Sequence, residues 1–219
     1  MMGNGSICWW IPNRLEKDEG LCNIIRRVEK TGMSRQQQRS FIKRFRKGRE
    51  RTVPSVSAVF GYLLSFHNNE EEGKREAGKA FIPGANEHIK GMVKVNKDFI
   101  SFVQKQKREG TATLDMDATL VETNKSEALY CYKGFKSYQP LNTWWAEQEM
   151  VLHTEFRDGN VPAGYDQLRV LIEALKCLPE GIKEVRLRSD TAGYQHNLMK
   201  YCAMGKNKRF GGNKVCDWL

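Results

Sequence analysis

Acidic side chains recur at alternate positions in the segment Thr111–Val121, which has the apolar–polar alternation of a β-strand. Leu114 and Met116 would point to one face of this strand, and Asp115 and Asp117 to the other. Two carboxylates on a mostly buried strand are unfavourable unless something pairs with them. A divalent metal ion is a natural partner, so the segment predicts a metal-binding strand.

A further carboxylate, Asp190, follows a second predicted strand at residues 185–189. Two divalent ions about 3.5–4 Å apart can clamp the attacking and leaving oxygens of a phosphodiester. Magnesium prefers oxygen ligands and keeps several waters, so few protein carboxylates are needed. We expect Asp117 and Asp190 to hold the metal. Asp115, about 6.6 Å along the strand from Asp117, either assists or hydrogen-bonds a neighbouring loop.

Positive charge is concentrated in one part of this 219-residue chain, whose net charge is +10. Residues 26–51 hold eleven basic residues against Glu29 and Glu50, a balance of +9, and the remaining chain has 25 basic and 24 acidic residues. Binding to a polyanion releases condensed counterions, so the segment predicts contact with nucleic acid. A solvated helix with a basic face is the alternative. The residues expected to contact DNA are Arg39, Lys43, Arg44, Arg46 and Lys47.

Helical periodicity predicts the elements of the N-terminal half. We expect one helix over residues 26–50, a second that begins near Pro54, and a third that begins at Asn86. Residues 26–107 are therefore predicted to form a basic, helical, DNA-binding region. No stable element is assigned to residues 1–25, where glycines and a proline interrupt any period.

The pattern changes to strands at Thr111. Strands are predicted over 111–121, 138–147, 150–156 and 185–189, with helices around 168–175 and 195–201. This order indicates an α/β fold in which a mixed sheet carries helices packed on it. Trp144 and Trp145 either stack on DNA bases or lie in the core. Lys133, Lys136 and Arg188 either contact phosphate or are solvated.

Composition narrows the functional classes. No apolar run approaches the length of a membrane span, and the short run after Cys8 lacks the features of a signal peptide, so we expect a cytoplasmic protein without a membrane partner. The six scattered cysteines lack the spacing of a zinc site and are expected to be reduced thiols. The absence of a glycine-rich phosphate loop argues against an ATPase.

Four motifs carry a resemblance to a known family. They are Leu114–Thr119, Tyr132–Leu141, Phe156–Pro162 and Leu187–Tyr194. In order and spacing they resemble a bacterial insertion-sequence transposase of the group called transposase DDE domain, group one, over residues 35 to 210. The resemblance implies a ribonuclease-H-like fold, two Mg²⁺ ions (Mn²⁺ as a substitute), and cutting and joining of the element's DNA ends.

The resemblance also assigns roles and partners. Asp117 resembles the first catalytic aspartate of the family and Asp190 the second. The implied partner is double-stranded DNA, both the transposon ends and the target, and the intact enzyme of such a family can be an oligomer.

The chain departs from the family after Asp190. The family uses a third carboxylate, a glutamate well beyond the second aspartate, and none of the 29 residues after Asp190 is a glutamate. We therefore expect an inactive, truncated copy, with a partial catalytic core at 111–210, an aberrant tail at 211–219, and a sheet that lacks its later strands. The alternatives are a non-catalytic DNA-binding remnant and a nuclease without joining activity.

Overall fold

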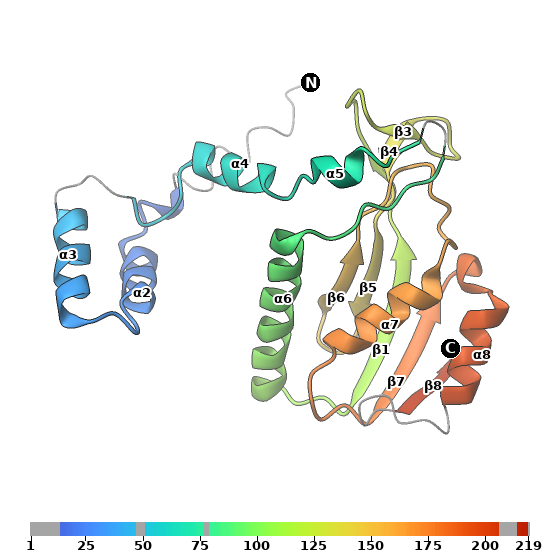
Figure 1. The fold of residues 1–219 in the computed structure, drawn as a ribbon. Helices are drawn as coiled ribbons and strands as arrows, with labels where there is room; N and C mark the ends of the chain where they lie inside the picture. Colours follow the sequence, from blue (N-terminus) through green and yellow to red (C-terminus); the bar gives the residue numbers. More distant parts are fainter. Residues whose placement is uncertain (1–13, 47–50, 77–78, 206–213, 219) are drawn as a thin grey trace. The chain divides into compact units, whose positions relative to one another are not determined.

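The computed structural model of the protein describes residues 14–46, 51–76, 79–205 and 214–218 (Figure 1). The chain divides after His67 into two compact units, residues 1–67 and 68–219. Each unit has its own elements and is described by itself.

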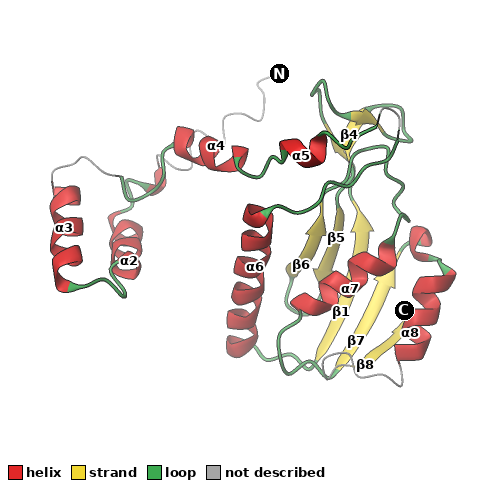
Figure 2. Ribbon diagram, in the orientation of Figure 1, coloured by secondary structure: helices red, strands yellow, loops and turns green. Residues whose placement is uncertain are grey.

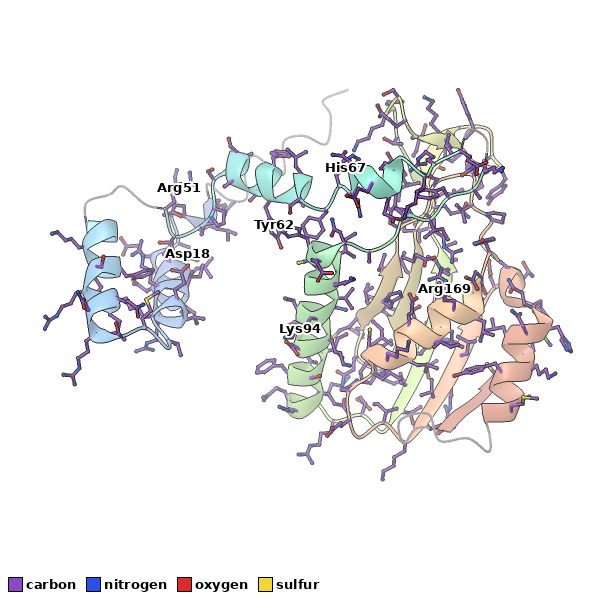
Figure 3. All side chains as sticks on the ribbon, in the orientation of Figure 1. Asp18, Arg51, Tyr62, His67, Lys94 and Arg169 are labelled. Carbon is purple, nitrogen blue, oxygen red and sulfur yellow. The ribbon has the colours of Figure 1, made fainter. Side chains whose placement is uncertain are left out.

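Helices form the first unit, and one of them begins sooner than the sequence predicted. Helix α2 runs over Glu19–Glu29, inside the segment to which no element was assigned. Asp18, labelled in Figure 3, caps it by accepting a hydrogen bond from the Leu21 backbone N–H at 2.9 Å. This cap satisfies one of the free N–H groups at the helix start, and the early glycine Gly20 does not prevent the first turn.

A turn divides the region that was predicted as one helix over residues 26–50. Helix α3 begins only at Arg35 and runs to Arg46. Between the two helices Gly32 has a φ of 86°, a left-handed conformation that glycine adopts without steric strain. The prediction of a single helix was wrong because this glycine ends α2 in the middle of the basic segment.

Helix α4, Val56–Leu64, confirms the helix predicted after Pro54. The residues before it are fixed by long-range hydrogen bonds. The Glu16 carboxylate accepts from the backbone N–H groups of Thr52 at 3.0 Å and Val53 at 2.6 Å. Arg26 Nε donates to Thr52 Oγ1 at 2.7 Å. Residues on both sides of the basic α2–α3 pair are thereby tied together within the first unit.

A mixed five-stranded sheet is the centre of the second unit, with the strand order β6-β5-β1-β7-β8 (Figure 2). β6, β5 and β1 are antiparallel neighbours, and β7 and β8 run parallel to β1. The strands are β1 (Thr111–Ala118), β5 (Leu141–Trp145), β6 (Met150–Glu155), β7 (Glu184–Ser189) and β8 (Lys214–Trp218). The predicted order of strands and helices is confirmed, and the architecture is compatible with a ribonuclease-H-like fold.

Three helices pack on one face of this sheet. They are α6 (Glu87–Gln106), α7 (Gln167–Cys177) and α8 (His196–Gly205). One apolar cluster joins Ile100 of α6, Leu171 of α7 and Leu198 of α8 to alternate strand residues such as Leu114 and Leu187. The intervening strand residues, which include both Asp115 and Asp117, belong to the opposite face.

Trp144 and Trp145 lie on opposite faces of the sheet. Trp145 is fully buried in the core, whereas Trp144 lies opposite Asp115 and is 38% exposed. The register of β5 and β6 shifts between Thr143 and Trp144. This bulge lets Leu152 reach the core while Thr154, two residues on, hydrogen-bonds Asn142 on the other face.

The end of the chain corrects another expectation. Residues 211–219 were expected to be an aberrant tail that leaves the sheet without strands beyond β7. Lys214–Trp218 instead forms β8, which pairs in parallel with β7. Val215 and Trp218 have high strand propensity, and the outer side of β7 offers backbone groups to pair with.

A small second sheet is inserted between β1 and β5. Its strands, in the order β2-β4-β3, are β2 (Val121–Glu122), β4 (Lys136–Tyr138) and β3 (Leu129–Tyr130). The single strand predicted over 138–147 is divided at Pro140, which has no N–H to donate to a ladder. Before this sheet, the four-residue helix α5 (Asn69–Glu72) occupies the polar stretch that follows α4.

Candidate functional site

The register of β1 and β7 brings Asp117 and Asp190 together. Met116 lies opposite Ser189. Asp117 follows Met116 within β1, and Asp190 follows Ser189 just after the end of β7. Because the strands are parallel, their carboxyl ends meet at the same edge of the sheet, which is where open α/β sheets bind ligands. Residues 73 positions apart in the chain are thereby brought to the same edge of the sheet.

Asp117 is an exposed carboxylate on the face of the sheet that the helices leave open. On the β5 side it lies opposite Asn142, whose side-chain oxygen accepts a hydrogen bond from Thr154 at 3.0 Å. Within the described ranges no hydrogen bond or ion pair of the Asp117 side chain is found. Its carboxylate oxygens are therefore available to an external cation.

Asp190 is also exposed but partly engaged. Its Oδ1 accepts a hydrogen bond from the Ala192 backbone N–H at 3.0 Å, which caps the short 3₁₀ helix η1 (Thr191–Gly193). A side chain at Gly193 would collide with Ser189, so this glycine allows the turn to close tightly behind the strand. The Arg-Ser-Asp-Thr-Ala-Gly sequence thereby fixes the Asp190 backbone and leaves one carboxylate oxygen, Oδ2, toward solvent.

Asp115 does not join this pair, because Arg188 on the neighbouring strand holds it. The guanidinium donates from Nε to Oδ1 and from Nη2 to Oδ2, the second at 2.5 Å. These hydrogen bonds raise the pKa of Arg188 above its ordinary value. Asp115 was predicted to assist the metal or to hydrogen-bond a loop. Its partner is instead a strand residue, one for which phosphate contact or solvation was expected.

The donor set suits a hard divalent cation by ligand type. Asp117 and Asp190 supply carboxylate oxygens, and magnesium retains several waters when bound by few protein ligands. Across the part of the chain that the structure describes, no group of three or more His, Cys, Asp or Glu residues could hold a metal ion. The described residues thus supply two carboxylates at this edge of the sheet and no third acidic neighbour.

The Phe156–Asn160 motif is a structural junction near the same edge of the sheet. Arg157 is fully buried and donates from Nε to Glu155 at 2.8 Å, and buried Asp158 pairs with Arg75. Burial raises the pKa of Asp158, and the hydrogen bond from Arg75 opposes that rise. These contacts connect β6 to the loop before α6, so the motif positions the site without adding a metal ligand.

The next residue of the motif, Gly159, lies against the small sheet. A Cβ there would lie 2.5 Å from the Ser137 carbonyl oxygen and 2.8 Å from that of Leu129. Only glycine fits this approach, which holds β3 and β4 against the turn after β6. No local signal in the sequence indicates the Arg75–Asp158 pair, because its members are 83 residues apart.

The basic residues of the first unit are described in part. Arg39 and Lys43 are exposed on α3. Arg44 and Arg46 also belong to α3, but their side chains fall outside the described set, and Lys47 lies outside the described residues altogether. The predicted DNA-contacting segment is thus a short helix with solvent-facing cations.

Neither a protein-family model nor a curated protein matches the sequence. Two solved structures are similar at a TM-score of 0.30. The Mos1 transposase paired-end complex with left transposon end is 14% identical over 84% of this chain, and the Mos1 strand transfer complex is 12% identical over 90%. This chain spans 56% and 58% of the lengths of those two chains.

The helices that the structure describes include none long and apolar enough to cross a membrane. The site is built on a mixed α/β unit with an open polar sheet face, and the basic helices belong to the other unit of the chain.

Proposed function

We propose that the protein is a DNA transposase of the DDE type, which acts on the ends of an insertion sequence by metal-dependent phosphoryl transfer. The observation that carries the proposal is the β1–β7 register, which places Asp117 next to Asp190 at the carboxyl edge of the sheet. The motif resemblance assigns the two catalytic aspartates of that family to these same two residues.

Each residue has a defined part in the proposed reaction. Asp117 and Asp190 would hold Mg²⁺, or Mn²⁺ in its place, and Asp190 Oδ1 would remain in its bond to the Ala192 N–H. Such ions, when bound, activate water and stabilise charge on the phosphodiester oxygens. The cations of α3 would attract DNA and hold the duplex near the protein through counterion release.

A second candidate, a DNA-binding protein without catalysis, is favoured by one observation. Residues 191–219 contain no glutamate, and the two carboxylates at the site have no third acidic neighbour in the described ranges. Residues 1–219 alone are therefore expected to bind DNA and a divalent cation but to cut and join poorly.

The deciding experiment measures Mn²⁺ binding and plasmid nicking with the full chain and its Asp117→Asn and Asp190→Asn variants. Asp98→Asn is the matched control, because Asp98 is an exposed aspartate on α6. We expect both site variants, and not the control, to lose Mn²⁺ affinity by roughly tenfold or more.

The two readouts separate the candidate functions. The transposase is supported if the full chain binds Mn²⁺ and nicks the plasmid, and if both site variants abolish the nicking. Joined DNA products distinguish a transposase from a nuclease. DNA binding with no nicking at any Mn²⁺ concentration supports the non-catalytic alternative. Equal Mn²⁺ affinity in all four proteins would reject the metal site.

A further inference from the structure

Helix α3 has two distinct faces. Gln38, Phe41 and Ile42 are partly buried, whereas Gln36, Arg39, Ser40 and Lys43 are exposed. These four follow the spacing i, i+3, i+4, i+7, which places them along one side of the helix, and Arg35 and Gln37 are exposed as well.

The three consecutive glutamines of α3 have different roles. Gln37 closes a reciprocal cap with Ser34: its side chain accepts from the Ser34 N–H at 2.8 Å, and its own N–H donates to Ser34 Oγ at 3.3 Å. The Gln38 side chain donates to the Met33 carbonyl at 3.0 Å. Gln36 has no such bond to the described residues, so its amide is available to a ligand.

Charge identifies the kind of ligand. The twelve residues of α3 include five Arg or Lys and no Asp or Glu. An acidic polymer is therefore attracted to this helix, and DNA is the partner already required by the proposed function. A helix about 10–12 Å in diameter also fits a DNA major groove about 12 Å wide.

We infer that α3 reads base sequence in the major groove, with Gln36 and Arg39 contacting base edges and Lys43 contacting phosphate. Glutamine pairs bidentately with adenine and arginine with guanine. Both residues lie in the N-terminal half of the second helix of a helix pair, the part that reaches bases in helix-turn-helix proteins. The inference rests on the proposed function only in its choice of duplex DNA as the partner.

The helix geometry sets the spacing of the recognised bases. Residues 36 and 39 are separated by about 4.5 Å along the helix axis, compared with about 3.4 Å between successive base pairs. The two side chains can therefore reach adjacent base pairs. The predicted site contains an adenine and a guanine one or two positions apart.

The test uses the full chain and duplex DNA. A randomised duplex library is enriched for bound sequences, and affinity is then measured for the enriched duplex and for a scrambled duplex of the same composition. We expect Gln36→Ala and Arg39→Ala to reduce the ratio of the two affinities by about 5- to 100-fold each, the range for one lost bidentate base contact. Arg39→Lys keeps the charge but loses the planar fork, so it should reduce the ratio as well.

Matched variants separate base reading from phosphate contact. Lys43→Ala should weaken binding to both duplexes similarly and lower the salt-dependence slope by about one. Gln106→Ala and Lys17→Ala, at exposed positions outside α3, should leave the affinity ratio unchanged. Far-UV circular dichroism checks that each variant folds, which is expected because the substituted side chains are exposed.

Specific outcomes overturn the inference. Binding without any enriched sequence, or an enriched sequence whose affinity ratio survives both Gln36→Ala and Arg39→Ala, shows that α3 does not read bases. In either case the proposed function stands if Asp117→Asn still abolishes Mn²⁺ binding. Failure of the full chain to bind any duplex overturns both.

Discussion

Asp115 and Arg188 form a two-point ion pair across the parallel strands β1 and β7, two positions before Asp117 and Asp190 on the same two strands. The pair faces the open side of the sheet, with the exposed Trp144 opposite Asp115 on β5. Its geometry matches the β1–β7 register that aligns the two site aspartates. Because Arg188 engages both carboxylate oxygens, we expect Asp115 to align the two strands rather than to bind the metal.

Replacing Asp115 by Asn should lower the free energy of unfolding by no more than about 1 kcal/mol, because a solvent-accessible ion pair is weakly stabilising. The side chains of Arg188 and Asp115 are 47% and 32% exposed. Mn²⁺ affinity should change by less than about threefold, which isothermal titration calorimetry would detect. A loss of affinity as large as that of Asp117→Asn would instead make Asp115 a metal ligand.

Removing Arg75 should destabilise the second unit through Asp158. The Asp158 side chain is only 2% exposed, and in Arg75→Ala its carboxylate loses its ion-pair partner. Breaking a buried pair typically costs about 3–5 kcal/mol, and the 25% exposure of Arg75 reduces our expectation to about 2–3 kcal/mol. Urea unfolding of Arg75→Ala against Lys74→Ala, which breaks a more exposed pair with Glu71, measures the difference.

Alanine should be tolerated at one glycine and not at another. Gly159→Ala would place Cβ 2.5 Å from the Ser137 carbonyl oxygen, and we expect a loss of about 1–3 kcal/mol or more from the forced shift. Gly91, inside α6, has open space around its Cβ position, so Gly91→Ala should stabilise the protein by about 0.5–1 kcal/mol. Thermal unfolding of both variants measures whether each substitution stabilises or destabilises the protein. Stabilisation by Gly159→Ala would contradict the close packing at this glycine.

Stability should decrease as the pH falls below about 7, with His153 as one cause. Burial lowers the pKa of His153 below its ordinary value of 6.5, although Glu173 and Glu155 favour the charged form. Its Nε2 lies 3.4 Å from Glu173 but lacks hydrogen-bond geometry. The unfolded chain therefore binds a proton at a higher pH than the folded chain does. The stability that neutral His153 provides above pH 6.5 is lost as the pH falls toward the folded pKa.

The slope from this single proton is at most about 1.4 kcal/mol per pH unit. Substituting His153 by Gln should flatten the dependence of unfolding free energy on pH between about 7.5 and 5.5. His88→Gln, at an exposed position, is the control and should keep the original slope. An unchanged slope in His153→Gln would assign the acid sensitivity to other groups.

Elements with a clear period were predictable from the sequence, and so was the position of Asp117 and Asp190 at one edge of the sheet. Their role as metal ligands stays a prediction. The alternation around Asp117 and the helical spacing of Leu168 and Leu171 are local signals, and β1 and α7 confirm them. The end of α2 at Glu29, before the turn that contains Gly32, was missed because a basic helical composition continues on both sides of that turn. The partner of Asp115 could not be predicted, because the register of two strands 73 residues apart is set by tertiary packing.

The parallel pairing of β1 with β7 also sets the order in which the site comes into existence. At a synthesis rate of about 5–20 residues per second, the 73 residues between the aspartates take about 4–15 s to emerge. During that interval the antiparallel β1–β5–β6 meander can form, since its connections are local. A nascent chain therefore carries Asp117 on a folded scaffold for seconds before Asp190 can arrive, and the carboxylate pair appears only after α7 has crossed the sheet.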